Sequence, residues 1–133
     1  MQRVYFDNAA TTSLDAEVLA AMMPYFTTHY GNASSIHSYG RECRMAIEKS
    51  RKTVATLLNA KPGEIFFTSC GSESSNTAIQ CAVRDLGCTH IITSAIEHHA
   101  TLHTVQFLAS LQYCTVSYLK LTHNGVVDRV DFE

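Results

Sequence analysis

Hydrophobic residues recur at helical spacing along most of the chain. The first such stretch begins near Asp15, a residue type that caps helix N-termini, and carries Val18, Met22 and Phe26 at four-residue intervals. Pro24 should kink or interrupt this helix, because proline lacks the N–H group that a helix interior uses. We therefore expect a helix with one apolar side.

A longer amphipathic stretch runs from about Ser38 to Asn59. Charged residues occupy one of its sides, and apolar residues occupy the other at helical spacing. This helix should lie on the surface of a core. The residues expected to face that core are Cys43, Ile47, Val54 and Leu58.

Two further helical stretches cover residues 73–86 and 99–111, and Gly87 stands where the first of them can end. Each carries apolar residues at intervals of three and four positions. The residues expected to face inward are Ile79, Val83 and Leu86 in the first stretch, and Leu102, Val105 and Leu108 in the second.

Three short apolar runs predict strands at residues 65–68, 90–93 and 114–119. Because these runs alternate with the helical stretches, we expect an α/β fold with a mostly parallel sheet and flanking helices. A turn is predicted at residues 123–125, and a further helix begins at 131–133. Three strands would leave sheet edges and apolar faces uncovered, so we expect the chain to be truncated.

The composition is that of a globular protein, with 46% hydrophobic and 17% charged residues among 133. The net charge of -2, with basic and acidic residues interspersed, argues against nucleic acid or a membrane as a partner. The apolar run near the N-terminus is too short for a signal peptide or a membrane span, which favours a cytoplasmic protein.

The cysteines are odd in number, widely spaced and without a C-x-x-C pair. This pattern argues against a disulfide framework and against a metal site. We expect most of them to be buried thiols in a reducing compartment. They are Cys43, Cys70, Cys81, Cys88 and Cys114.

Small residues join a predicted strand to a predicted helix between Thr68 and Ser74. The free N–H groups and the positive dipole end of that helix favour a phosphate, and the hydroxyl of Ser72 adds a donor. Taken alone, the segment is more typical of a serine cap on a glycine turn, which any α/β protein can have.

The residues Glu97, His98 and His99 follow the predicted strand at 90–93, at the sheet edge where α/β folds bind ligands. A histidine there can stack on a flat aromatic ligand or move a proton near neutral pH, although a single histidine is more often only exposed or capping. Two small polar loops, residues 7–12 and 31–37, fit simple turns when each is taken alone.

These segments occur together and in order, and in that combination they resemble the cysteine desulfurases of the class V aminotransferase family. The resemblance spans essentially the whole chain and points to the branch that serves nitrogenase and iron–sulfur cluster assembly. The segments that carry it are residues 4–12, 31–38, 67–76, 91–94 and 97–98.

The resemblance implies the N-terminal part of a fold-type-I transferase that depends on pyridoxal 5'-phosphate. Residues 1–14 would lie with the small domain, and residues 15–133 would form the N-terminal part of the large cofactor domain. Gly71 and Ser72 match the positions that bind the cofactor phosphate. His98 matches the catalytic histidine that stacks on the pyridine ring. No metal is implied.

Three positions depart from the family pattern. Ala33 stands where proline is usual, Ser72 where threonine is common, and Cys70 where a small glycine-like residue is common. Ser72 keeps the hydroxyl group that a phosphate needs. The position of Cys70 differs from that of the family's mobile catalytic cysteine.

The implied reaction removes sulfur from L-cysteine, giving L-alanine and an enzyme persulfide for iron–sulfur cluster or thio-cofactor synthesis. The family's cofactor lysine and catalytic cysteine fall downstream of the residues present, so we expect the 133-residue chain alone to be inactive. The resemblance also implies a homodimer and a sulfur-acceptor or scaffold protein as partner.

Three alternatives remain open. Another class V enzyme, such as a selenocysteine lyase or an aminotransferase, would share the phosphate turn and the ring histidine. A non-catalytic interaction fragment would explain the expected truncation. A nucleotide-binding protein also places a glycine turn before a helix, but neither G-x-G-x-x-G nor G-x-x-x-x-G-K-[ST] is present.

Overall fold

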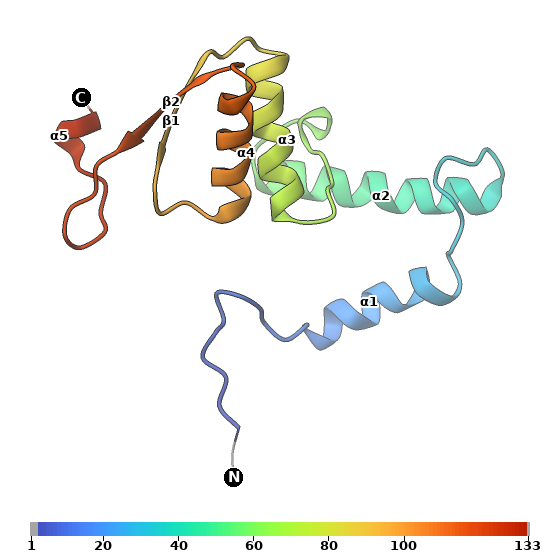
Figure 1. The fold of residues 1–133 in the computed structure, drawn as a ribbon. Coiled ribbons are helices and arrows are strands. Elements are labelled where there is room, and N and C mark those ends of the chain that lie inside the picture. Colours follow the sequence, from blue (N-terminus) through green and yellow to red (C-terminus); the bar gives the residue numbers. More distant parts are fainter. Residues whose placement is uncertain (1–2, 133) are drawn as a thin grey trace. The chain divides into compact units, whose positions relative to one another are not determined.

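The computed structural model describes residues 3–132. Met1, Gln2 and Glu133, at the outer ends of the two domains expected from the sequence, lie outside the described residues. The chain divides into two compact units between Phe66 and Phe67. The first unit contains the helices α1 and α2, and the second contains the sheet with the helices α3, α4 and α5 (Figure 1).

Helix α1 spans Ala16–Thr27, and its predicted N-cap is confirmed. The Asp15 carboxylate accepts hydrogen bonds from the backbone N–H groups of Glu17 (2.8 Å) and Val18 (3.3 Å), two donors that have no acceptor inside the helix. Pro24 was expected to kink or interrupt the helix, and the second of these two outcomes, an interruption, does not occur. Proline removes one backbone hydrogen bond, and the helix continues for three more residues.

The apolar side expected on α1 is uncovered. Val18, Met22 and Phe26 are all exposed, and α1, which is described in full, has no buried residue. The four-residue spacing therefore predicted the helix correctly, but the unit that contains α1 supplies no core for it.

Helix α2 spans Ser38–Leu57. Of its expected inward face, Cys43 is buried and Val54 is half-buried, whereas Ile47 and Leu58 are exposed and were wrongly placed. The buried residues of α2 are Gly40, Cys43 and Ala55, so the helix is buried near its start and near its end and not along the whole expected face. A Cβ atom at Gly40 would collide with carbonyl groups of the preceding loop.

The predicted strand at residues 65–68 does not form. A short 3-10 helix, η1 (Pro62–Glu64), leads into it, and Ile65 is extended (φ -102°, ψ 121°). An extended segment becomes a strand only when a neighbour pairs with it, and the sheet in the described residues holds two strands elsewhere. The prediction of a three-stranded sheet is therefore wrong by this one strand.

The sheet consists of β1 (His90–Ser94) and β2 (Thr115–Leu119), which pair in parallel from His90 opposite Thr115 to Ser94 opposite Leu119. Helix α4 (His99–Ser110) forms the crossover between the strands, and α3 (Gly71–Arg84) packs beside α4 (Figure 1). The α/β class and the parallel pairing expected from the sequence are confirmed.

The core of this unit lies between the two helices and the sheet. Val105 and Leu108 of α4 are buried and Leu102 is half-buried, as predicted, whereas Leu86 lies beyond the end of α3 and is exposed. Gly87 takes a left-handed conformation (φ +71°) three residues after the last residue of α3, which fits its predicted role as a helix stop. The core cluster is Val83, Leu108 and Cys114, with Ile79, Ile91 and Val116 packed against it.

After β2 the chain turns at Gly125 (φ +75°), where a turn was predicted, and ends in the short helix α5 (Arg129–Phe132). None of the helices in residues 3–132 is both long and apolar enough to span a bilayer.

The cysteines are free thiols, and the expectation that most are buried is wrong. Cys43 and Cys114 are buried, whereas Cys70, Cys81 and Cys88 are exposed. The exposed thiols lie at the start of α3, on α3, and just after its end, away from the side of that helix that meets the core.

Candidate functional site

A cavity of about 390 Å³ lies at the N-terminal ends of α3 and α4. Its volume falls in the range of small-molecule sites, about 300–1,000 Å³. Gly71, Ser72 and His98, the three site residues expected from the sequence, all line it. The full lining is Cys70, Gly71, Ser72, Ser75, His98, Ala100 and Thr101.

Gly71 and Ser72 are the first two residues of α3. The N–H groups of a first helical turn have no acceptor inside the helix, and the helix dipole adds partial positive charge there. Beyond its chain neighbours and the backbone of its own helix, no atom lies within 4 Å of the position that a Cβ at Gly71 would take, so this position is open to a ligand. These residues therefore fit an anionic group such as a phosphate.

The lining contains no lysine or arginine side chain. An anion in the cavity would be held by backbone N–H groups, hydroxyl groups and helix dipoles rather than by an ion pair. The start of α4 contributes to this environment as well, because Ala100 and Thr101 lie in its first turn and line the same cavity.

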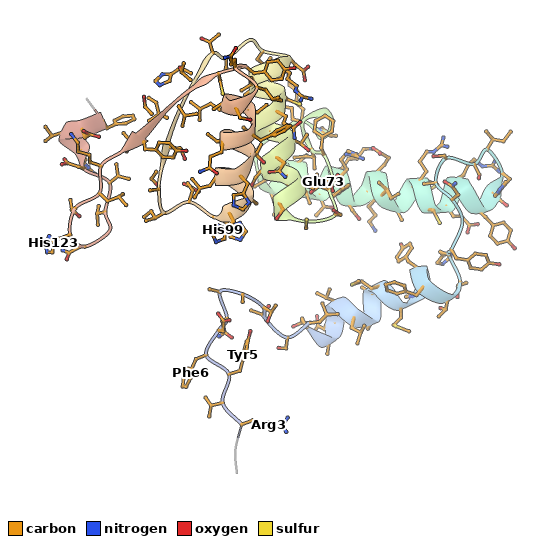
Figure 2. All side chains as sticks on the ribbon, in the orientation of Figure 1. Arg3, Tyr5, Phe6, Glu73, His99 and His123 are labelled. Carbon is orange, nitrogen blue, oxygen red and sulfur yellow. The ribbon has the colours of Figure 1, made fainter. Side chains whose placement is uncertain are left out.

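Glu73 ties the turn before α3 to the helix. Its carboxylate accepts hydrogen bonds from the hydroxyl and from the backbone N–H of Ser69, both at 2.6 Å. These two donors, the hydroxyl first, hold the pKa of Glu73 below its usual value. Figure 2 labels Glu73 at this end of α3. The carboxylate thus organises the turn whose next residues line the cavity.

Hydrogen-bond donors of the same turn also act on the thiol of Cys70. The backbone N–H of Glu73, the hydroxyl of Ser69 and the backbone N–H of Ser72 lower the pKa of Cys70 from its ordinary value of 9.0. The same donors that favour a thiolate would favour any other anion at this helix end. The start of α3 therefore offers hydrogen-bond donors to an anion, and the charge of the Glu73 carboxylate acts in the opposite direction.

His98 is the N-cap of α4, and its Nδ1 atom accepts a hydrogen bond from the backbone N–H of Ala100 at 3.1 Å. Since Nδ1 is an acceptor here, the neutral imidazole carries its proton on Nε2. The ring is thus fixed at the cavity with Nε2–H as its free donor. A flat aromatic ligand and a proton-transfer step both suit an imidazole held in this way.

His99 is exposed and does not line the cavity. Its ring centroid lies 6.3 Å from that of His98 and 5.4 Å from that of His103, and Figure 2 labels it at the start of α4. The two adjacent histidines therefore occupy different environments.

Ser75, Ala100 and Thr101 line the cavity but were not expected from the sequence. Helical spacing contains a usable signal for them. Ser75 lies three residues after Ser72, and Thr101 lies three residues after His98, so each pair shares one helix face.

Residues 4–133 match the aminotransferase class-V family. The chain is 44% identical over 134 residues to cysteine desulfurase 2 of Trichormus variabilis, covering 100% of this chain and 33% of that relative. Among solved structures, a NifS-like protein superposes with a TM-score of 0.87 at 41% identity, covering 96% of this chain and 35% of the other. The structure of SspA in complex with cysteine superposes with a TM-score of 0.85 at 36% identity, covering 93% of this chain and 36% of the SspA chain. The chain thus spans about a third of the length of the relatives it matches.

Proposed function

Because the chain belongs to the class-V aminotransferase family, we propose that it supplies the cofactor-phosphate site of a cysteine desulfurase that depends on pyridoxal 5'-phosphate. The observation that carries this proposal is the cavity at the start of α3 and α4. There, Gly71, Ser72 and His98 surround one space that has backbone donors at a helix start and no lysine or arginine side chain.

In this proposal the N–H groups of Gly71 and Ser72, together with the Ser72 hydroxyl, bind and orient the phosphate. His98 stacks on the pyridine ring and exchanges a proton at Nε2, the ring nitrogen that its bond to Ala100 leaves free. Bound pyridoxal phosphate would supply an electron sink for bond cleavage at the substrate. Residues 1–14 belong with a small domain, and residues 15–133 with the large cofactor domain.

The proposed substrate is L-cysteine, and the SspA structure in complex with cysteine supports this choice. The substrate's C–S bond breaks, its sulfur forms an S–S bond with an enzyme thiol, and the carbon takes up the thiol proton to leave L-alanine. The persulfide sulfur then passes to an acceptor or scaffold protein for iron–sulfur cluster or thio-cofactor synthesis. We assign the active protein to a homodimer in the cytoplasm, where exposed free thiols such as Cys81 and Cys88 remain reduced.

The lysine that binds the cofactor and the cysteine that takes the sulfur are proposed to come from outside these 133 residues. None of the four lysines of the chain lines the cavity. Lys120 is instead paired with Asp131 at 2.7 Å. Turnover by the 133-residue chain alone is therefore not expected. The lysines are Lys49, Lys52, Lys61 and Lys120.

Incubation of the full native chain with pyridoxal phosphate, L-cysteine and a reducing thiol tests the proposal. Alanine and sulfide should appear in equal amounts. Release of selenide from selenocysteine but no sulfide from cysteine would assign a selenocysteine lyase instead, and formation of a keto acid would assign an aminotransferase. If none of these substrates gives a product, the non-catalytic interaction fragment is the alternative that remains.

A further inference from the structure

We infer that Asn76 and Thr104 are positioning residues for this site, and that their hydrogen bond sets how the starts of α3 and α4 face each other. The inference rests on the proposed function. It concerns two residues that lie outside the cavity and act through Ser72 and His98.

The pair lies one helical turn from the cavity. Asn76 follows Ser72 by four residues on α3, and Thr104 follows Ala100 by four residues on α4, so each shares a helix face with a residue that lines the cavity. One turn corresponds to a rise of about 5.4 Å. The bond between the two side chains therefore joins the helices just behind the ligand space.

Thr104 is buried, with 8% of its surface exposed, and its hydroxyl donates to the Asn76 Oδ1 atom. Between two packed helices a buried hydroxyl without a partner is unfavourable. The bond therefore favours one register of α4 against α3. Apolar contacts farther along, between Val83 and Leu108, hold the helices together but do not select a register by hydrogen bonding.

A chain of contacts continues from this pair to the imidazole. The Thr104 hydroxyl lies 3.0 Å from the Ala100 carbonyl oxygen, and the Ala100 N–H donates to Nδ1 of His98 at 3.1 Å. The single hydroxyl proton serves the Asn76 or the Ala100 oxygen at any moment. Loss of the hydroxyl thus changes the spacing of the helices and the hydrogen bonding of the Ala100 carbonyl, on the same residue whose N–H orients His98.

The test measures the dissociation constant for pyridoxal 5'-phosphate in the full native chain and in its variants. Thr104→Val removes the hydroxyl at nearly constant shape and should raise that constant by about fivefold or more, with a shifted absorption maximum of the bound cofactor. Thr104→Ser restores the hydroxyl and should return both readings to wild-type values. Thr53→Val is the matched control, because the Thr53 hydroxyl donates to the carbonyl of Lys49, four residues earlier in its own helix, and Thr53 does not line the cavity.

A second variant removes the same hydrogen bond from the side of α3. It keeps the inference testable if Thr104→Val does not fold. Asn76→Ala should weaken cofactor binding by a similar factor. The double variant Asn76→Ala/Thr104→Val should be no weaker than the weaker single variant, because both remove the same bond.

Wild-type affinity in Thr104→Val or Asn76→Ala, failure of Thr104→Ser to restore it, or fully additive effects in the double variant would overturn the positioning role. These results would leave the proposed function standing if the unaltered chain binds the cofactor. An unaltered chain without affinity for pyridoxal phosphate would instead overturn the proposed function and the inference together.

Discussion

Ser72 and His98 reach one cavity because each stands at the start of a helix, and the two helices begin at the same end of the unit (Figure 1). Starts of helices are marked locally in sequence, by small residues and by capping side chains, so both positions could be predicted without a structure. The hydrogen bond between Asn76 and Thr104 could not be predicted from the sequence. The two residues are 28 positions apart, and the bond depends on how α3 packs against α4.

The two adjacent histidines should behave differently. In the full native chain, His98→Ala should change the absorption spectrum of bound pyridoxal phosphate and lower alanine release by about 100-fold, the scale of a lost proton-transfer group. His99→Ala should leave both nearly unchanged, because His99 does not line the cavity. The opposite ranking would move the proposed role from the capping residue of α4 to its neighbour.

The pKa values of Cys70 and Cys81 should be shifted in opposite directions from the ordinary value of a thiol. Donors at the start of α3, the Glu73 N–H first, lower the pKa of Cys70 below 9.0, whereas the hydrogen bond with Asp85 raises the pKa of Cys81 above it. The rate of alkylation by iodoacetamide should therefore rise at lower pH for Cys70 than for Cys81, as measured by mass spectrometry of each peptide.

The variant Ser69→Ala should move the alkylation midpoint of Cys70 upward and leave that of Cys81 in place, because the Ser69 hydroxyl donates to the sulfur of Cys70 and does not lower the pKa of Cys81. The lowered pKa of Cys70 also stabilises the native state above pH 9.0, the ordinary pKa of the thiol. This stabilisation is lost as the pH falls through the lower pKa that Cys70 has in the native state. Identical midpoints for the two thiols would contradict the role assigned to the hydrogen-bond donors at the start of α3.

At the scale of elements, local pattern predicted each helix from α1 to α4 and both strands to within a few residues. It failed where the outcome depended on a partner. Residues 65–68 have the composition of a strand but no strand forms there, and the apolar side of α1 is exposed although its spacing is that of a buried face. Pairing and burial are tertiary properties, so the pattern alone could not decide them.

Helix α4 offers a sharp test of the core. Leu108 is fully buried against Val83 and Cys114, whereas its neighbour Phe107 is 53% exposed. Leu108→Ala should lower the free energy of unfolding of this unit by about 2–5 kcal/mol, because it leaves a cavity in the only buried cluster found among residues 67–132.

Phe107→Ala serves as the control on the same helix and should change stability far less. Denaturant titration followed by circular dichroism measures both variants. Equal losses from the two substitutions would show that α4 is packed on a different face from the one described.

At the scale of the whole molecule, large apolar side chains remain exposed in both units, among them Phe26 on α1, Phe66, and Ile92 on β1. Relatives of this family are about three times as long as the chain, which is consistent with further structure covering such faces in the whole protein.

The 133-residue chain by itself should therefore self-associate loosely. Sedimentation velocity should show an average mass that rises with protein concentration, because exposed apolar faces pair without a specific geometry. The family dimer is not expected to persist. A monodisperse monomer that unfolds in one cooperative transition would contradict this expectation.

The central claim is that the start of α3 grips the phosphate of the cofactor. It is tested most directly by titrating the full native chain and its Ser72→Ala variant with pyridoxal 5'-phosphate and, separately, with pyridoxal, which lacks the phosphate. Ser72→Ala should raise the dissociation constant for pyridoxal phosphate by about 5- to 30-fold, corresponding to about 1–2 kcal/mol for one charge-assisted hydrogen bond, and should leave that for pyridoxal within about twofold. Unchanged affinity for pyridoxal phosphate, or an equal loss for both ligands, would contradict the claim.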